Sequence, residues 1–479
     1  MDPKLVRPDL PVPPSWPVGD AYLRQSEAAL PAVTYRDIFR DARLRTLIGQ
    51  AVASNRDLRV SVANIAQARE LYRIQRADRF PQLDATGRYQ FSRGVGGGFT
   101  GGGGGNGGQS FFQTQLGVTA FELDLFGRVA SLTRAAQQRF FAQEAAARAT
   151  RLTLVGDVAE AWLTYAADRS LLRVAEDTAR LAESSVRLTR ARVEGGVAPR
   201  SDLTQAQQIL STAQAQATQQ RTLVAQDVNA LQLLVGAPFD PALLPASIEE
   251  AAPTLAVLPA GLDSRVLLRR PDVVQAEYEL RAANAEIGAA RAALFPRISL
   301  TGLLGFASDA LGSLFNGDSF TYSASPTLAY PIFQAGAARA NVRLTQAQRD
   351  ATLAAYERAI QVAFREVSDA LARQGTIDEQ LRASRQLVAA TNETLRLNEA
   401  RYRGGIDTFL SLLDAQRSLL QAQQTLVDAQ LQAGANRVAL YRALGGDATL
   451  ETTANGPAPV SPSGALRADE PLTTPPPAP

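Results

Sequence analysis

The sequence of 479 residues contains no cysteine and no histidine. The lack of cysteine excludes disulfides, thiolate metal sites and thiol nucleophiles. The lack of histidine removes the commonest general base and metal ligand, although carboxylate or Ser/Lys chemistry would still be possible. No constellation of residues supports such chemistry, so we expect no enzyme activity, no cofactor and no metal site. The formal net charge is only +2, so the chain has no charge excess of the kind that nucleic-acid binding requires.

Long hydrophobic runs are also missing. No stretch approaches 18 consecutive apolar residues, so no transmembrane helix is expected. Membrane-spanning β-strands would show no such run either. The first residues, MDPKLVRPDLPVPPSWP, are polar and Pro-rich and carry no secretory signal. A cytosolic protein and a mature or trimmed chain both fit this start.

What the sequence does contain is an internal repeat. Ala191–Gln207 read ARVEGGVAPRSDLTQAQ, and Ala400–Gln416 read ARYRGGIDTFLSLLDAQ, with the second glycines 405 − 196 = 209 residues apart. The motif FPQL at Phe80 returns as FPRI at Phe295, where 295 − 80 = 215. Each half therefore has the order helix, irregular segment, very long helix, Gly-Gly stop and second helix.

The helical segments are too long for a compact globular domain. The first can run from about Arg128 to Val193, which at 1.5 Å per residue is about 100 Å. Apolar residues follow each Gly-Gly stop at intervals of seven: Leu412, Leu419, Leu426, Ala433 and Leu440 in one half, and Leu203, Leu210, Ala217, Val224 and Leu231 in the other. An ordinary buried stripe would look similar, but the matched register in both halves favours coiled-coil packing.

Four shorter segments alternate with a period of two, as strands do. They are Gln82–Ser92, Phe112–Ala120, Arg297–Phe306 and Phe320–Tyr330, and the Gly-rich tract GVGGGFTGGGGGNGG separates the first two. Strands of about ten residues can cross a bilayer when tilted, although surface hairpins on a soluble protein would show the same pattern. Four strands alone cannot close a barrel in lipid, so several chains would have to pool them, and three chains would supply twelve.

Several motifs together resemble a known family. They are the paired FP motifs, FELDLFGR at Phe121–Arg128, PIFQAG at Pro331–Gly336 and RYRGGIDTFLSLLDAQ at Arg401–Gln416. In this order and duplication they are similar to the TolC family of outer-membrane efflux channels, over roughly Tyr35–Gly446. The early stretch RPDLPVPPSW resembles the lipoprotein branch of that family, the OprM/NodT-like proteins.

The resemblance implies a mainly α fold with a membrane β part. Each chain would supply coiled-coil hairpins to a long α-helical barrel and four β-strands to the membrane, and a homotrimer would complete a twelve-stranded β-barrel. The barrel would sit in the outer membrane of a Gram-negative bacterium and extend into the periplasm. It would act as the exit duct of a tripartite efflux or multidrug export system, opened by a periplasmic adaptor (membrane fusion protein) and energised by an inner-membrane pump.

The expected organisation follows the repeat. A Pro-rich extended segment at 1–34 precedes a first structural repeat at 35–240, which contains a β-hairpin at about 82–124 and a tip turn at 195–196. An equatorial linker at 241–264 leads to the second repeat at 265–446, with a β-hairpin at about 297–331 and a tip turn at 404–405. The tail at 447–479 closes the chain, and we expect disorder from Ala454 onward because this part is rich in Pro, Ala and Thr.

The Gly-Gly stops have a structural and a functional interpretation. Glycine readily adopts the left-handed conformation that ends a helix, so plain C-capping explains them locally. The resemblance implies that they are also the tip turns of two periplasmic hairpins, which contact the adaptor: Gly195, Gly196, Gly404 and Gly405.

The resemblance also places a periplasmic gate. It pairs Tyr402, three residues before the second tip glycine, with Asp202 in the opposing hairpin. It assigns the pore constriction to Leu410 and Asp414, and a trimer would then hold three Asp414 carboxylates around one axis, where they attract cations. Without the resemblance, the sequence favours a solvated helix residue at Asp414, and with the resemblance we favour the gate.

The chain departs from the family pattern in two respects. TolC has an arginine two residues after the second tip glycine and an acidic residue four beyond it, where this chain has Asp407 and Ser411; Asp407 is included among the candidate gate residues, and closure is placed mainly on Leu410. The lipoprotein branch begins with a lipidated cysteine, so we infer a trimmed or engineered N-terminus here.

Two other protein classes share some of these features. A soluble coiled-coil scaffold without channel activity explains the heptads, but it does not explain the strand hairpins at equivalent places in both halves. A periplasmic adaptor would carry a single long hairpin and a lipoyl-like domain.

Overall fold

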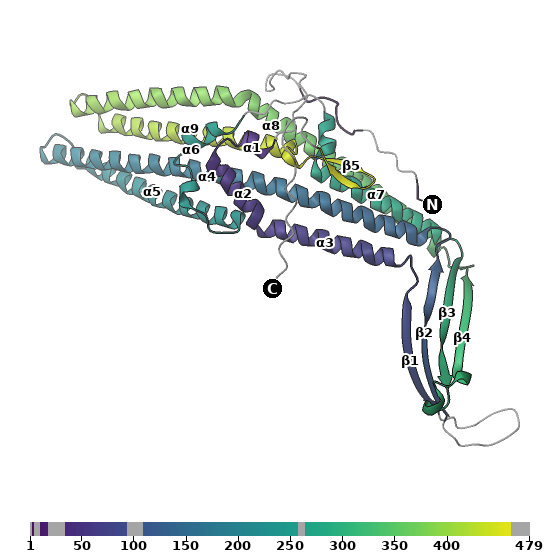
Figure 1. Ribbon diagram of the computed structural model, residues 1–479. Helices are drawn as coiled ribbons and strands as arrows, with labels where there is room; N and C mark the ends of the chain where they lie inside the picture. Colours follow the sequence, from purple (N-terminus) through teal and green to yellow (C-terminus); the bar gives the residue numbers. More distant parts are fainter. Residues whose placement is uncertain (1, 4–9, 18–33, 93–108, 257–263, 461–479) are drawn as a thin grey trace. The chain divides into compact units, whose positions relative to one another are not determined.

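The computed structural model describes residues 2–3, 10–17, 34–92, 109–256 and 264–460. Its α-helices are α1 (Tyr35–Ile38), α2 (Ala42–Ser54), α3 (Arg56–Ala77), α4 (Arg128–Glu194), α5 (Arg200–Val235), α6 (Ile248–Ala251), α7 (Pro271–Ala292), α8 (Ala337–Arg403) and α9 (Phe409–Ala443). Its strands are β1 (Leu83–Ser92), β2 (Gln109–Leu123), β3 (Arg297–Ser308), β4 (Phe320–Ala329), β5 (Leu450–Thr453) and β6 (Gly456–Pro459) (Figure 1). The fold is thus mainly α with a separate β part, as the sequence predicts.

The long helices reproduce the repeat offset. Helices α4 and α8 both have 67 residues, and 337 − 128 and 403 − 194 both give 209. Helices α3 and α7 both have 22 residues, with 271 − 56 = 215. Within the described parts of the chain, no helix has both the length and the apolar character needed to cross a membrane.

The chain divides into two compact units. A sheet unit comprises residues 1–8, 65–142 and 276–355, and a hairpin unit comprises residues 9–64, 143–275 and 356–479.

The sheet unit contains a four-stranded antiparallel sheet in the order β1-β2-β3-β4. Strand β2 pairs Val118 with Gly302 but Phe121 with Leu300, so it carries one extra residue between these pairs. Ala120 lies in this bulge with a φ of +51°, and its N–H donates to Thr301 Oγ1 at 3.1 Å. Because a bulge shifts the side-chain alternation by one residue, the apolar face continues on Phe121 and Leu123. The strand therefore continues to Leu123, beyond the Ala120 at which the alternation predicts its end.

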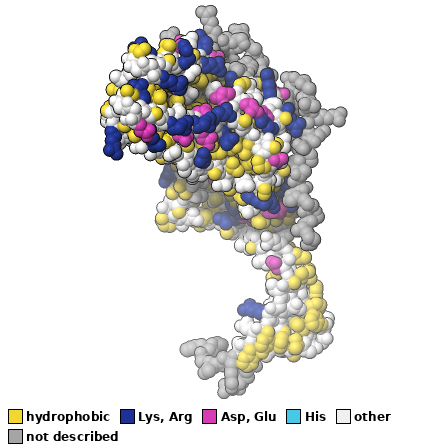
Figure 2. Space-filling view, turned by 90° about the vertical axis from the view of Figure 1, so that its left-hand side faces the viewer, with side chains coloured by type: hydrophobic (Ala, Val, Ile, Leu, Met, Phe, Trp, Pro, Cys, Tyr) yellow, Lys and Arg dark blue, Asp and Glu magenta, His cyan; other side chains and the backbone are white. Residues whose placement is uncertain are grey.

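The register brings the apolar sides of all four strands onto one face. Cross-strand neighbours on this face include Leu83 with Val118, Leu116 with Leu304, and Leu304 with Tyr322. Figure 2 shows the result as a continuous hydrophobic surface along the sheet. Every residue of the edge strands β1 and β4 is exposed. The Gly-rich tract before β2 lies outside the described residues.

The FELDLFGR motif links β2 to α4 by side-chain chemistry. Asp124 accepts hydrogen bonds from the N–H groups of Val129 at 3.1 Å and Ala130 at 2.7 Å, which caps the first turn of α4. Arg128 donates to both oxygens of Glu122 at 2.8 and 2.7 Å. The motif therefore fixes the point at which the strand ends and the helix begins.

The hairpin unit is built from two helical hairpins, α4 with α5 and α8 with α9 (Figure 1). The heptad positions that the sequence predicts are buried in α9 at Leu412, Leu419, Ala433 and Leu440. In α5 the same positions are buried only at Ala217 and Leu231. The heptad stripe is thus more completely covered in the second hairpin than in the first.

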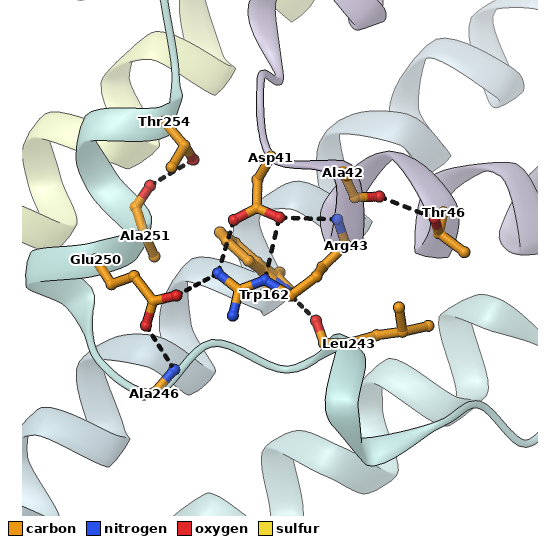
Figure 3. Close-up of polar contacts among 10 residues, drawn as sticks. All are labelled: Asp41, Ala42, Arg43, Thr46, Trp162, Leu243, Ala246, Glu250, Ala251 and Thr254. Carbon is orange, nitrogen blue, oxygen red and sulfur yellow. Dashed lines mark hydrogen bonds and ion pairs between the residues drawn. The ribbon is translucent and has the colours of Figure 1, made fainter.

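A polar cluster ties the segment after α5 to α2 and α4 (Figure 3). Arg43 lies over the ring of Trp162 at 5.9 Å and pairs with Asp41 at 2.8 Å and Glu250 at 2.5 Å. The Trp162 indole N–H donates to the carbonyl of Leu243 at 3.1 Å. Burial raises the pKa of Asp41, but hydrogen bonds from Arg43 more than offset this effect and hold the pKa below its ordinary value. The cluster fixes the connection between the two halves of the chain.

The C-terminal tail corrects one expectation. Disorder was expected from Ala454, but β5 and β6 pair as a two-stranded antiparallel sheet between Leu450 and Pro459. Leu450 is fully buried, and Thr453 Oγ1 donates to the Gly456 carbonyl at 2.7 Å across the turn. The local hydrophobic anchor and the turn thus outweigh the Pro-rich composition. Residues 461–479 lie outside the described residues.

Near the N-terminus, Trp16 is buried and packs on Phe364 of α8, with ring centroids 5.0 Å apart. This contact anchors the described part of the Pro-rich N-terminal segment to α8.

Candidate gate and tip turns

Both Gly-Gly stops have the same backbone geometry. In the first, Gly196 N–H donates to Val193 at 3.0 Å and Val197 N–H donates to Arg192 at 2.9 Å. In the second, the corresponding bonds join Gly405 to Tyr402 at 3.1 Å and Ile406 to Arg401 at 2.9 Å. This pair of bonds is the Schellman motif, which satisfies the last carbonyls of a helix.

The second glycine of each pair is the conformationally demanding one. Gly196 has a φ of +72° and Gly405 a φ of +74°, a region where a Cβ is unfavourable. The nearest atoms to a Cβ at Gly195 or Gly404 would be the carbonyl oxygens of Ala191 at 3.3 Å and Ala400 at 3.5 Å. The residue after each motif is exposed, with Val197 at 67% and Ile406 at 70%. The turns thus present apolar side chains on a rigid backbone.

A single apolar cluster lies behind both turns and contains residues from all four helices. Its buried members are Val186, Ala206, Leu395, Tyr402, Phe409, Leu412, Ala415 and Leu419. Because α4, α5, α8 and α9 all contribute, the ends of the two hairpins pack against each other within the chain.

Tyr402 is buried in this cluster, at 2% exposure. Its hydroxyl lies 3.4 Å from Thr189 Oγ1, its ring packs on Phe409 at 5.7 Å, and its carbonyl accepts from Arg192 Nη1 at 2.6 Å. The sequence pairs Tyr402 with Asp202, but the contact partners of Tyr402 in the described chain come from α4 and α9.

Asp202 lies in the first turn of α5. Its N–H donates to the Pro199 carbonyl at 3.2 Å, and the Ser201 hydroxyl lies 3.4 Å from its carboxylate. A link between Asp202 and Tyr402 stays a prediction.

Asp407 is held within its own turn. Arg401 Nε donates to Asp407 Oδ2 at 3.2 Å, and the Thr408 N–H donates to Oδ1 at 2.9 Å. Hydrogen bonds from Thr408, Ser411 and Arg401 hold the pKa of Asp407 below its ordinary value. The carboxylate is therefore ionised at neutral pH and stabilises the start of α9.

Leu410 and Asp414 lie one helical turn apart on the exposed side of α9, where Leu410 is 68% exposed. Leu410 therefore adds little to the buried core of the single chain. Subtracting the repeat offset of 209 gives Ser201 and Gln205, both exposed, at the corresponding positions of α5. Only the second hairpin thus presents an apolar and an acidic side chain here.

The sequence prediction missed Arg192 and Thr189, which contact Tyr402 from α4. In the internal repeat, Arg192 is equivalent in sequence to Arg401, since 401 − 192 = 209. The sequence therefore shows that an arginine precedes each tip turn. It does not show which of the two arginines packs on an aromatic ring.

A second pair of acidic residues lies further along the first hairpin. Asp168 of α4 accepts from Gln220 Nε2 at 2.9 Å. Burial and the adjacent Asp168 carboxylate together raise the pKa of Asp227, on α5, to about 7. Asp227 therefore exchanges its proton near neutral pH.

Comparison with known proteins places this arrangement in context. The family model described as outer membrane efflux protein matches residues 47–237 and 262–446. The chain is 44% identical to the probable efflux pump outer membrane protein TtgC of Pseudomonas putida over 441 residues, which are 92% of this chain and 90% of that protein. It is 42% identical to the outer membrane protein OprJ of Pseudomonas aeruginosa, over 93% of this chain and 92% of that protein.

A solved structure has the same fold. The open state of the MtrE outer membrane channel of Neisseria gonorrhoeae superposes with a TM-score of 0.80 at 34% identity. The match covers 93% of this chain and 98% of that one.

Proposed function

This chain belongs to the outer membrane efflux protein family, and we propose that three copies of it form a gated exit duct that a periplasmic adaptor and an inner-membrane pump engage. It is an efflux channel of the outer membrane of Gram-negative bacteria. The family is one of transport channels and not of enzymes. The proposal concerns the trimer, the gate residues, the tip turns and the partners.

The observation that carries the proposal is the sheet with one apolar face and two uncovered edges. Unpaired backbone groups are costly in lipid, so β1 and β4 need partners if the apolar face contacts the membrane. Other copies of the same chain can supply both partners. The β4 edge of one copy would pair with the β1 edge of the next, and so on around a ring. A closed ring of three copies, each with four strands, would contain twelve strands.

The repeat predicts the register between copies. Within the chain, Phe121 lies opposite Leu300 and Leu123 opposite Ile298. Adding 209 to the β2 positions and subtracting 215 from the β3 positions gives Tyr330 opposite Ala85, and Ile332 opposite Leu83, of the next copy. Ile332 is 91% exposed and Leu83 is 64% exposed, as expected for residues that await a partner.

Crosslinking tests the trimer directly, because the chain has no native cysteine. Ala85→Cys combined with Tyr330→Cys should give disulfide-linked oligomers up to the trimer after oxidation with copper phenanthroline in membranes. The matched control, Thr86→Cys with Tyr330→Cys, places the two Cβ atoms on opposite faces of the sheet and should crosslink poorly. Equal crosslinking in both variants, or none in either, would rule out this register.

The gate in this proposal is the exposed Leu410 and Asp414 side of α9. In a trimer, three leucines and three carboxylates converge, so the leucines narrow the pore while the carboxylates attract cations. The tip turns at Gly195–Gly196 and Gly404–Gly405 are the proposed adaptor contacts, since they carry exposed Val197 and Ile406.

Single-channel conductance in planar bilayers tests the gate. Wild-type protein should give small, cation-favouring conductance, and Asp414→Ala should raise the conductance and weaken the cation preference. Gln205→Ala, at the repeat-equivalent position of α5, should leave both unchanged. If Asp414→Ala leaves the conductance unchanged, the gate does not lie at Asp414. If assembled wild-type protein gives no conductance, the proposed duct is wrong.

A further inference from the structure

Arg192 joins the first hairpin to the second at a point that the sequence does not mark. Its guanidinium carbon lies 4.7 Å from the centroid of the Tyr402 ring, and its Nη1 donates to the Tyr402 carbonyl at 2.6 Å. Its Nε is buried and has no hydrogen-bond partner among the described residues. Stacking of a guanidinium on a tyrosine ring is a favourable cation–π contact that strengthens with desolvation.

The carbonyl that Arg192 contacts is part of the second tip turn. It also accepts the Gly405 N–H at 3.1 Å, one of the two bonds that define the Schellman motif there. Arg192 is itself part of the first tip turn, because its carbonyl accepts from Val197 at 2.9 Å. One side chain therefore connects the two turns that reverse the chain.

The repeat shows that this connection is specific to one side. Arg401, the equivalent of Arg192, pairs with Asp407 in its own turn and is 56% exposed at the side chain. The equivalent of Tyr402 is Val193, since 402 − 209 = 193, and valine has no aromatic face. Two arginines at matching positions thus have different roles, one within a turn and one between hairpins.

We propose that Arg192 is a positioning residue for the gate, which holds the α8–α9 hairpin against the α4–α5 hairpin in the closed channel. The inference rests on the proposed gate and adds a latch to it. Moving the second hairpin away separates the guanidinium from both the Tyr402 ring and the Tyr402 carbonyl. The Thr189 hydroxyl, 3.4 Å from the Tyr402 hydroxyl, belongs to the same latch.

The test compares Arg192→Met with Arg187→Met, a control whose exposed side chain pairs only with Glu183 of the same helix, by single-channel recording of the full-length protein. Methionine keeps much of the side-chain length but has neither the charge nor the donors. A hydrogen bond from a charged group corresponds to roughly a tenfold change in an equilibrium. Open probability should therefore rise by about tenfold or more in Arg192→Met, by less in Arg192→Lys, and not at all in Arg187→Met.

A double variant separates a latch from general loosening of the packing. If Arg192 acts through Tyr402, the combination of Arg192→Met with Tyr402→Leu should open the channel no more than the stronger single variant. Simple multiplication of the two effects would overturn the latch. Should Arg192→Met fail to assemble, Arg192→Lys and Tyr402→Leu carry the test, and an unchanged open probability in both would overturn it.

The outcomes also separate the latch from the gate. If Asp414→Ala alters the conductance while every Arg192 variant behaves as wild type, the latch is wrong and the gate stands. If assembled wild type and all variants fail to conduct, the proposed duct fails and the latch fails with it.

Discussion

The two hairpins of this chain have nearly the same backbone and different side chains at the positions of the proposed gate. Helices α4 and α8 have equal length, and their turns make the same hydrogen bonds. Yet α9 presents Leu410 and Asp414 where α5 presents Ser201 and Gln205. The two halves thus share their backbone geometry, while only the second carries the side chains of the proposed constriction.

The hairpins also differ in how their helices are held. Helix α9 begins with Thr408, whose hydroxyl accepts from the Ser411 N–H at 3.3 Å, whereas α5 begins after Pro199, which has no side-chain cap. In the interior, α5 carries the titrating Asp227 where α9 carries Asn436, since 436 − 227 = 209. Asn436 donates to the Ala370 carbonyl at 3.0 Å and is neutral at every pH. The first hairpin is therefore the pH-sensitive one.

The largest expected effect lies at the centre of the long helices. Trp162 of α4 is fully buried, and its repeat equivalent in α8 is Leu371, at 3% exposure. Trp162→Ala should lower the free energy of unfolding by about 3–5 kcal/mol, because it leaves a large cavity and removes the partners of Arg43 and of the Leu243 carbonyl. Leu371→Ala should cost less, about 2–3 kcal/mol. Urea denaturation in detergent measures both, and a larger loss in Leu371→Ala would contradict this ranking.

A medium effect is expected at the turns, where the hairpins should respond alike. Gly196→Ala and Gly405→Ala each force an alanine into the left-handed region and should cost about 1–2 kcal/mol. Gly195→Ala and Gly404→Ala are the matched controls and should stay within about 0.5 kcal/mol of wild type. Thermal unfolding measures all four. Clearly unequal losses at Gly196 and Gly405 would show that the equal backbone geometry is not equally stabilised.

The smallest expected effect is a pH dependence of the free energy of unfolding that arises in the first hairpin. The folded-state pKa of Asp227, about 7, exceeds its unfolded value, so folding retains a proton that the unfolded chain releases. Stability should therefore fall as pH rises from about 4 to about 7 and then level off. Asp227→Asn should remove this dependence and raise stability at pH 8 by on the order of 1 kcal/mol, after allowance for solvent screening.

Thermal midpoints measured between pH 5 and pH 8 test this prediction, with Asn436→Ala as the control that should shift the midpoint equally at every pH. A wild-type midpoint that rises with pH, or an Asp227→Asn profile parallel to wild type, would count against it.

The sequence was sufficient for the elements whose signals are long and duplicated. The bounds of α4, predicted at about Arg128 and Val193, follow from periodicity and from a glycine stop that the repeat shows twice. The bulge at Ala120 could not be read, because alanine gives no sign of a positive φ and the alternation merely shifts by one residue. The β5–β6 hairpin was missed because a single buried leucine outweighs a composition typical of disorder.

The gate was predictable only in part. Exposure of Leu410 and Asp414 fits the family resemblance, and their role in the pore is still a prediction. The contacts of Tyr402 depend on how four helices pack at one point, and no local pattern distinguishes Arg192 from Arg401. Partner choice among side chains that are distant in sequence is a tertiary property, which a periodicity cannot supply.

Two helices of 67 residues, beginning and ending at the same interval of 209 residues, would give the proposed ring of three copies a nearly sixfold symmetry. Three copies would display six glycine turns, alternating between two kinds around the rim. A partner that recognises only their backbone meets six equivalent positions, whereas a partner that distinguishes the exposed Val197 from the exposed Ile406 meets three. The number of partner subunits bound per channel would thus report whether recognition uses the backbone or the side chains.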